Sequence, residues 1–174
     1  MKKRIVSIFA AVMICAAFTG CGDNTGSSGT DAPSGSVAEP TTKKPAEKTA
    51  ELKSSLSEAA ASSDKKYPEL VNIEAGTLND RFVIDDNDVA EFSAYICGSG
   101  AMPEEFGIFV AKDADAAKRV AEALNKRVEM QRKTFKDYTP DEMYKFDDCF
   151  VETNGSTVVY AICSDNEKAK ELLK

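Results

Sequence analysis

Aromatic side chains are unevenly distributed along this 174-residue chain, and their distribution limits where a hydrophobic core can form. All five tyrosines and seven of the nine phenylalanines lie in residues 67–174, whereas residues 22–66 contain no aromatic residue. A segment dominated by Gly, Ser, Thr, Ala, Pro, Lys and Glu buries too little apolar surface to offset its loss of entropy on ordering. We therefore predict a disordered linker over residues 21–66, in which Ala46–Ser63 forms only a transient helix without a partner, and one small folded domain over residues 67–174.

The first twenty residues have the features of a secretory signal peptide. Three cations at positions 2–4 precede an apolar run from Ile5 to Phe18, and a cationic start followed by about 7–15 apolar residues is typical of such peptides. A membrane-spanning helix needs about 20 apolar residues. The pattern therefore favours a cleaved signal peptide over residues 1–20.

A cysteine follows this apolar run at once. The sequence Phe18-Thr19-Gly20-Cys21 resembles the lipobox of bacterial lipoproteins, whose cysteine is lipidated and becomes the first mature residue. The usual leucine three positions before the cysteine is replaced here by Phe18. The resemblance implies that Cys21 is the lipidation site, and that the protein contacts the cell membrane through this anchor on the extracytoplasmic face. A secreted protein with a free Cys21 is the alternative.

The charge of the folded part excludes one class of partner. Residues 67–174 contain 13 Lys and Arg but 22 Asp and Glu, a net charge of −9. A uniformly acidic domain repels phosphate backbones, and the sequence has no basic stripe with interleaved aromatic residues. We therefore expect no binding to nucleic acid.

The pattern of apolar residues predicts an α+β fold. Alternation predicts strands at Glu91–Cys97 and Glu104–Lys112, and two more strands in Cys149–Cys163 around the Asn154-Gly155 turn. Apolar residues at helical spacing predict a long helix over Asp113–Phe135, and a short helix follows Cys163. The order ββαββα predicts an antiparallel sheet of two hairpins, with the long helix and the short C-terminal helix packed on one face.

Two long runs carry a resemblance to a family. The sequences EEFGIFVAKDADAAKRVAEALNKRVEMQRKTFKDYTP and VETNGSTVVYAICSDNEKAKELL resemble an uncharacterised family of lipoproteins from Gram-positive bacteria, domain-of-unknown-function family 4358. The resemblance covers roughly Phe92 to Leu173. It implies a lipidated, exported, small α+β domain and supplies no activity.

Several kinds of catalytic and metal site are excluded by composition. The chain has no histidine, so it has no Ser-His-Asp or Cys-His site and no histidine-ligated zinc. The run Asp85–Phe92 lacks the glycine of a calcium-binding EF-hand loop. We interpret the acidic pairs Asp85-Asp86, Glu104-Glu105 and Asp147-Asp148 as helix caps and solvated turns, and we predict no catalytic residue, metal site or cofactor.

Three cysteines remain in the domain. Cys97, Cys149 and Cys163 lie in predicted strands among apolar neighbours. Three thiols allow at most one internal disulfide, and the sequence leaves open whether one forms or all three are small buried hydrophobic residues.

The candidate binding residues lie on the long helix and just after it. Gln131 falls within the apolar stripe, Arg127 lies at its edge, and Tyr138 follows the predicted end of the helix. A buried amide without partners costs about 1–3 kcal/mol. Gln131 therefore either binds carbonyl groups in Lys136–Pro140 or forms, with Arg127 and Tyr138, a groove that recognises a carboxylate or a peptide.

These observations predict a membrane-tethered extracytoplasmic lipoprotein. Its domain is expected to bind a small ligand or a protein partner without catalysis. The alternatives are an envelope-processing enzyme that relies on carboxylates alone, and an accessory subunit of a surface complex.

Overall fold

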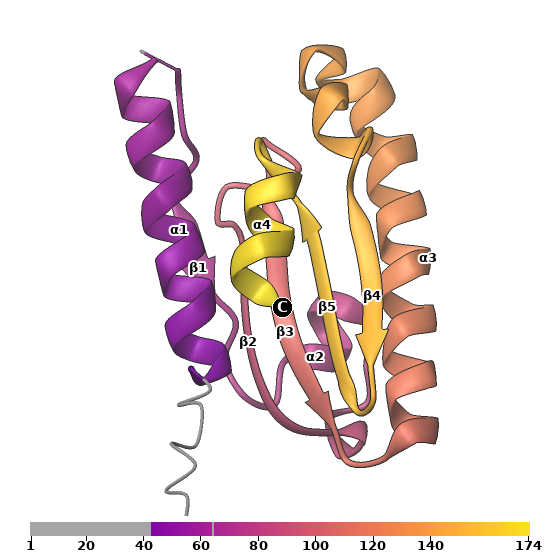
Figure 1. Cartoon of the computed structure of the whole chain (residues 1–174). Coiled ribbons are helices and arrows are strands. Elements are labelled where there is room, and N and C mark those ends of the chain that lie inside the picture. The colour runs from indigo at the N-terminus through magenta and orange to yellow at the C-terminus, as the bar shows by residue number, and fades with distance from the viewer. Residues whose placement is uncertain (1–42, 64) are drawn as a thin grey trace, which may run out of the picture. The chain divides into compact units, whose positions relative to one another are not determined.

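A five-stranded antiparallel sheet lies at the centre of the computed structural model, which describes residues 43–63 and 65–174 (Figure 1). In the order β1-β2-β3-β5-β4, the strands are β1 (Leu70–Asn72), β2 (Val89–Cys97), β3 (Glu105–Ala111), β5 (Thr157–Ile162) and β4 (Phe150–Asn154). Every neighbouring pair of strands is antiparallel. The predicted signal peptide, Cys21 and residues 21–42 of the predicted linker lie outside the described residues.

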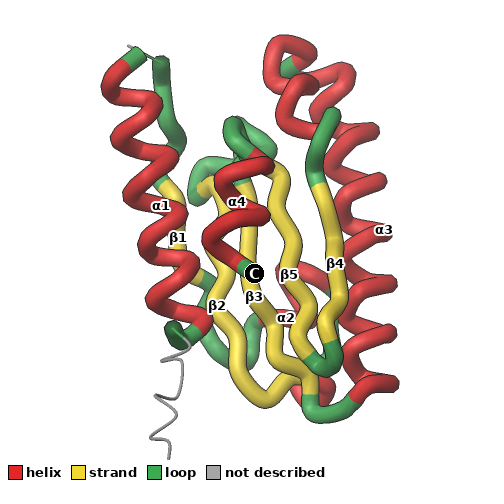
Figure 2. The backbone as a smooth tube through the Cα atoms, in the orientation of Figure 1, coloured by secondary structure: helices red, strands yellow, loops and turns green. Residues whose placement is uncertain are grey.

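In the part of the chain that the structure describes, four α-helices and two short 3₁₀ helices lie around the sheet (Figure 2). They are α1 (Pro45–Ser62), α2 (Leu78–Phe82), η1 (Asp86–Asp88), α3 (Ala114–Tyr138), η2 (Pro140–Phe146) and α4 (Asn166–Leu173). Within the described ranges, no helix combines the length and the apolar character needed to cross a membrane. The predicted α+β fold, with its antiparallel sheet, long helix and short C-terminal helix, is confirmed.

Both predicted hairpins are present, and the second turns one residue later than predicted. Asn154 pairs with Thr157, which leaves Gly155 and Ser156 as the two-residue loop. Gly155 has a φ of 58°, in the left-handed region that glycine adopts without steric cost. The requirement for a positive φ at the first loop position therefore places the turn at Gly155-Ser156 instead of Asn154-Gly155.

The long helix and the C-terminal helix pack on opposite faces of the sheet, which corrects the prediction of a single covered face. Phe109 of β3 belongs to the core cluster beneath α3, with Val120 and Leu124. The neighbouring residue Ile108 belongs to a second cluster, with Leu173 of α4. Because successive side chains of a strand point to opposite faces, apolar residues at both positions require cover on both sides.

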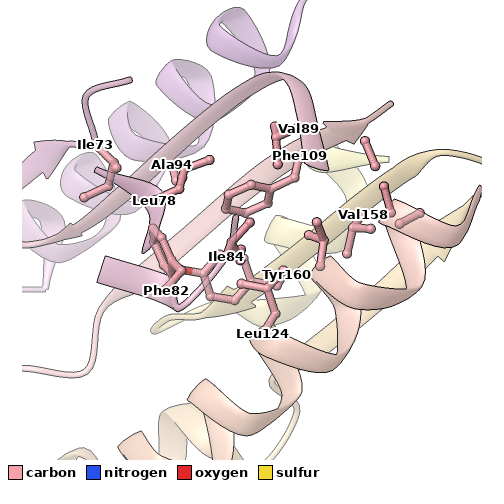
Figure 3. Close-up of a cluster of buried hydrophobic side chains, with 14 residues drawn as sticks. Ile73, Leu78, Phe82, Ile84, Val89, Ala94, Phe109, Leu124, Val158 and Tyr160 are labelled. Atoms are coloured by element: carbon pink, nitrogen blue, oxygen red, sulfur yellow. The ribbon is translucent and has the colours of Figure 1, made fainter. Parts of the chain in front are cut away.

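The core beneath α3 is built around aromatic rings (Figure 3). Tyr160 of β5 is fully buried, and its ring centroid lies 5.8 Å from that of Phe82 and 6.0 Å from that of Phe109. Phe82 ends α2 and meets Phe109 edge-on at 5.7 Å. These contacts hold α2 against the sheet, next to the middle of α3.

Helix α1 lies inside the predicted linker, and the structure differs from that prediction over Pro45–Ser62. Leu52 and Leu56 are buried in the core cluster that also contains Leu173 of α4, and Figure 1 shows α1 and α4 side by side. The buried Thr49 forms a 2.7 Å hydrogen bond with Ser93 of β2. Thr49, Leu52 and Leu56 form a stripe at helical spacing. This stripe packs on the sheet and α4, whereas the linker prediction expected a helix without a partner.

Candidate functional site

Two consecutive glutamates, Glu104 just before β3 and Glu105 at its first position, are buried on opposite sides of the sheet. The side chain of Glu104 is 0% exposed and that of Glu105 is 2% exposed. Glu105 lies on the α3 side with Arg127, and Glu104 contacts Lys145 of η2. The interpretation of Glu104-Glu105 as a solvated turn is therefore wrong: each carboxylate is an internal charge with its own cation.

Arg127 binds Glu105 through two parallel hydrogen bonds. Its Nε donates to Oε1 at 2.8 Å and one terminal nitrogen donates to Oε2 at 2.6 Å. The other terminal nitrogen donates to the backbone carbonyl of Arg81, and the guanidinium lies 4.7 Å from the ring centroid of Phe82. A planar guanidinium suits this combination of a bidentate carboxylate and an aromatic face.

The environment of this ion pair shifts the pKa of two groups. Burial alone lowers the pKa of Arg127, but the charge and hydrogen bonds of Glu105 outweigh it and the pKa is raised. Burial and the charge of Glu105 raise the pKa of Tyr160 well above its ordinary value. Arg127 therefore stays charged and Tyr160 stays neutral at any physiological pH.

The structure brings together two of the three predicted binding residues. Gln131 donates to Glu105 Oε2 at 3.0 Å, so Arg127 and Gln131 hold the same carboxylate. Tyr138 lies apart from them, 64% exposed, with its ring edge-on to Phe135 at 6.2 Å. The sequence predicted either a groove of all three residues for a carboxylate or a peptide, or a Gln131 bound to loop carbonyls; instead Glu105 of the same chain supplies the carboxylate that Gln131 binds.

Glu104 is held from two directions on the other face of the sheet. Lys145 Nζ donates to its Oε2, and the backbone N–H of Ser164 donates to its Oε1 at 3.0 Å. Lys145 also lies 2.6 Å from Glu142 Oε2 and is only 4% exposed. Burial lowers the pKa of Lys145, but the charge and hydrogen bond of Glu104 outweigh it and the pKa is raised.

Asn166 fixes the backbone around this ion pair. Its Nδ2 donates to the carbonyl of Lys145 at 2.8 Å, and its Oδ1 accepts from the backbone N–H of Cys163 at 3.1 Å. The residue begins α4 and is itself buried. It therefore joins β5, η2 and α4 next to Lys145.

Glu104 and Lys145 both line a pocket of about 470 Å³, which we call the Lys145 pocket. One wall comes from Leu56, Ala59 and Ala60 of α1, and another from Tyr144 with Glu142 of η2. Lys65, Lys66, Tyr67, Met102, Ser164 and Asp165 also line it. Glu104 and Lys145 are the most deeply buried charged side chains among these residues.

The pKa values of two tyrosines in the Lys145 pocket are raised. Burial, followed by the charges of Glu104 and Cys163, raises the pKa of Tyr67. Burial also raises the pKa of Tyr144. Both rings therefore present neutral phenols to the pocket at physiological pH.

The three domain cysteines are free thiols in the structure, and two of them are buried. Cys163 directly precedes Ser164 of the Lys145 pocket, and burial raises the pKa of its thiol to about 12. Cys149 is half-buried beside Arg132, and burial raises its pKa as well. These two thiols behave as small buried hydrophobic groups and not as thiolates.

Other hollows of similar volume lie elsewhere on the described part of the domain. One of about 480 Å³ lies beside Phe82 and Met130, on the outer side of Arg127. Another of about 440 Å³ lies between Lys43, Lys174 and the β3–β5 surface. The Lys145 pocket differs from both because its lining includes a charged pair in which neither side chain is more than 4% exposed.

The matched family model spans most of the elements described above. A model described as a domain of unknown function (DUF4358) matches residues 61–163. The chain belongs to this family. The matched part of the DUF4358 domain contains Glu104, Glu105, Arg127, Gln131 and Lys145, whereas Pro45 to Ala60 of α1 and the whole of α4 lie outside it. No curated protein and no solved structure gave a significant match to the chain.

Replacing Glu105 by glutamine tests whether its ion pair holds the DUF4358 domain together. Glu105→Gln leaves the guanidinium of Arg127, which is 13% exposed, without its counter-charge, and we expect a loss of about 3–5 kcal/mol in the free energy of unfolding. Urea titration measures this loss. The double variant Glu105→Gln, Arg127→Met is expected to lose less than the sum of the two single variants. Additive losses, or a loss below about 1 kcal/mol for Glu105→Gln, contradict the interpretation.

Proposed function

We propose that this protein is a lipid-anchored, extracytoplasmic binding protein, tethered through Cys21, whose DUF4358 domain binds a small ligand in the Lys145 pocket. The observation that carries the proposal is the buried Glu104–Lys145 pair in the lining of a concave site. Ligand sites combine apolar walls with a few fixed polar groups. Leu56, Ala59 and Ala60 provide such a wall here.

The hydrogen bonding of the pair supports recognition over catalysis. Lys145 and Ser164 occupy both oxygens of Glu104, so this carboxylate is held in one orientation and is not free to accept a proton from a substrate. A raised pKa keeps Lys145 protonated, whereas a nucleophilic or basic lysine needs a lowered pKa. Fixed charges of this kind orient a ligand.

A carboxylate-dependent enzyme is the second candidate. The observation that favours it is the convergence of Glu104 and Glu142 on Lys145 at one pocket. Glu142 is 22% exposed and is therefore the group that such a reaction would use. Turnover of a bound ligand by the wild type, lost in Glu142→Gln, would favour this enzyme over the binding protein.

Filling the Lys145 pocket tests the binding function. Ala60 lines the pocket, whereas its neighbour Ala61 is exposed and does not. We expect charged and uncharged small fragments to bind the wild type in ligand-observed NMR, and we expect Ala60→Phe to abolish this binding because the new ring occupies the site. Ala61→Phe is the matched control and is expected to bind as the wild type does. Fragments that bind equally to both variants would place ligand binding outside the pocket.

The proposed anchor has a test of its own. When the full-length protein is expressed in a bacterium that lipidates its exported proteins, the mature chain is expected to begin at Cys21 with the mass of attached acyl chains, because several chains are needed for stable anchoring. Cys21→Ala is expected to remain unmodified and to leave the membrane fraction. Mass spectrometry that finds another mature N-terminus, with Cys21 unmodified, would exclude the anchor.

A further inference from the structure

The most buried part of the Lys145 pocket has more negative than positive charge. Glu104 is 0% exposed and Glu142 is 22% exposed, and both contact Lys145, which is 4% exposed. Two carboxylates that share one ammonium leave a net charge of −1. An opposite charge placed nearby is strongly favoured where little water screens the interaction.

The two carboxylates differ in how fully their oxygens are used. Glu104 accepts from Lys145 and from the backbone N–H of Ser164. For Glu142, Oε2 is buried and lies 2.6 Å from Lys145 Nζ, the ammonium already shared with Glu104, and it has no hydrogen-bond partner within the described residues. Glu142 is thus the group with capacity for another donor, and a ligand reaches it from the pocket that it lines.

The rim of the pocket has the opposite charge. Lys65 and Lys66 are exposed lining residues. Asp165 is the acidic rim residue, and its carboxylate accepts from the backbone N–H of Lys168 at the start of α4. The rim therefore has an excess of one positive charge, set against the buried excess of one negative charge.

Two aromatic rings also line the pocket. Tyr67 and Tyr144 both line the pocket, and the Tyr67 hydroxyl is buried with no hydrogen-bond partner among the described residues. Aromatic faces attract cations, and ammonium ligands exploit this attraction. The Tyr144 ring already has the Lys145 ammonium 5.7 Å from its centroid, and the two aromatic walls favour a cationic group in the pocket.

We propose that the Lys145 pocket binds a zwitterionic ligand of the amino-acid type, with its ammonium directed to Glu142 and its anionic group directed to Lys65 and Lys66. This assignment rests on the proposed function, since it names the ligand class of the same pocket. The orientation of the ligand follows from the negative net charge of the buried part of the pocket and the positive net charge of its rim.

A matched series of probes tests the assignment. The full-length protein in neutral detergent micelles is titrated with 4-aminobutyrate, n-butylammonium and n-butyrate, which share a four-carbon chain and differ in charged groups. Saturation-transfer NMR is expected to give the tightest binding for 4-aminobutyrate and the weakest for n-butyrate, with a ratio of roughly tenfold or more between these two. Binding of n-butyrate as tight as that of 4-aminobutyrate, or no binding of any probe, overturns the assignment.

Variants locate each charge of the ligand. Glu142→Gln is expected to weaken both ammonium probes by roughly tenfold, whereas Glu167→Gln, which changes an exposed glutamate of α4 outside the pocket, leaves them unchanged. Lys66→Met is expected to weaken 4-aminobutyrate but not n-butylammonium. Equal losses in Glu142→Gln and Glu167→Gln overturn the assignment. If uncharged fragments still bind the wild type and not Ala60→Phe, the pocket remains a ligand site and only the ligand class is wrong.

Discussion

The structure depends on the burial of two adjacent carboxylates at the point where the chain enters β3. A buried carboxylate is strongly destabilising unless a cation and hydrogen bonds compensate its loss of hydration. Glu105 requires Arg127 of α3, and Glu104 requires Lys145 of η2. The dipeptide Glu104-Glu105 therefore sets where α3 and η2, both distant from it in sequence, contact the sheet. The ion pairs fix the positions of these helices even where their net contribution to the free energy of unfolding is small.

The two carboxylates also separate the domain into a structural side and a candidate binding side. On the α3 side, Arg127 and Gln131 satisfy Glu105, and the aromatic core of Phe82, Phe109 and Tyr160 lies next to them. On the other side, Lys145 is shared between Glu104 and Glu142 at a pocket. Arg127 and Gln131, two of the three predicted binding residues, thus belong to the network around Glu105, and the site proposed here lies across the sheet from them.

The parts of the fold that local sequence determines were predictable. The β2–β3 hairpin, the β4–β5 hairpin and α3 follow from alternation, turn chemistry and helical spacing. Which helix covers which face of the sheet was not predictable. Phe106 and Ile108 on one side of β3 and Phe109 on the other make both faces apolar, so either face could receive a given helix. The packing of helix α1 was missed because its stripe has only two large apolar residues, Leu52 and Leu56, and the sequence does not show that α4 and β2 cover them.

The candidate site was harder to predict than the fold. The helical spacing put Gln131 within the apolar stripe of α3 and Arg127 at its edge, but their partner Glu105 is separated from them by more than twenty residues of sequence. The available signal was two charged residues, Glu104 and Glu105, at the start of an otherwise apolar strand. Lys145 gave no comparable signal, because a lysine in a short polar segment is normally solvated.

Native-state hydrogen exchange tests the central claim most directly, since it reports the free energy at which each segment opens. If the two ion pairs fix α3 and η2 to the sheet, the backbone amides near Arg127 and Lys145 exchange with the same opening free energy as those of β3. Exchange near Arg127 or Lys145 at an opening free energy well below that of β3 would show that these segments open independently of the sheet, and would contradict the account.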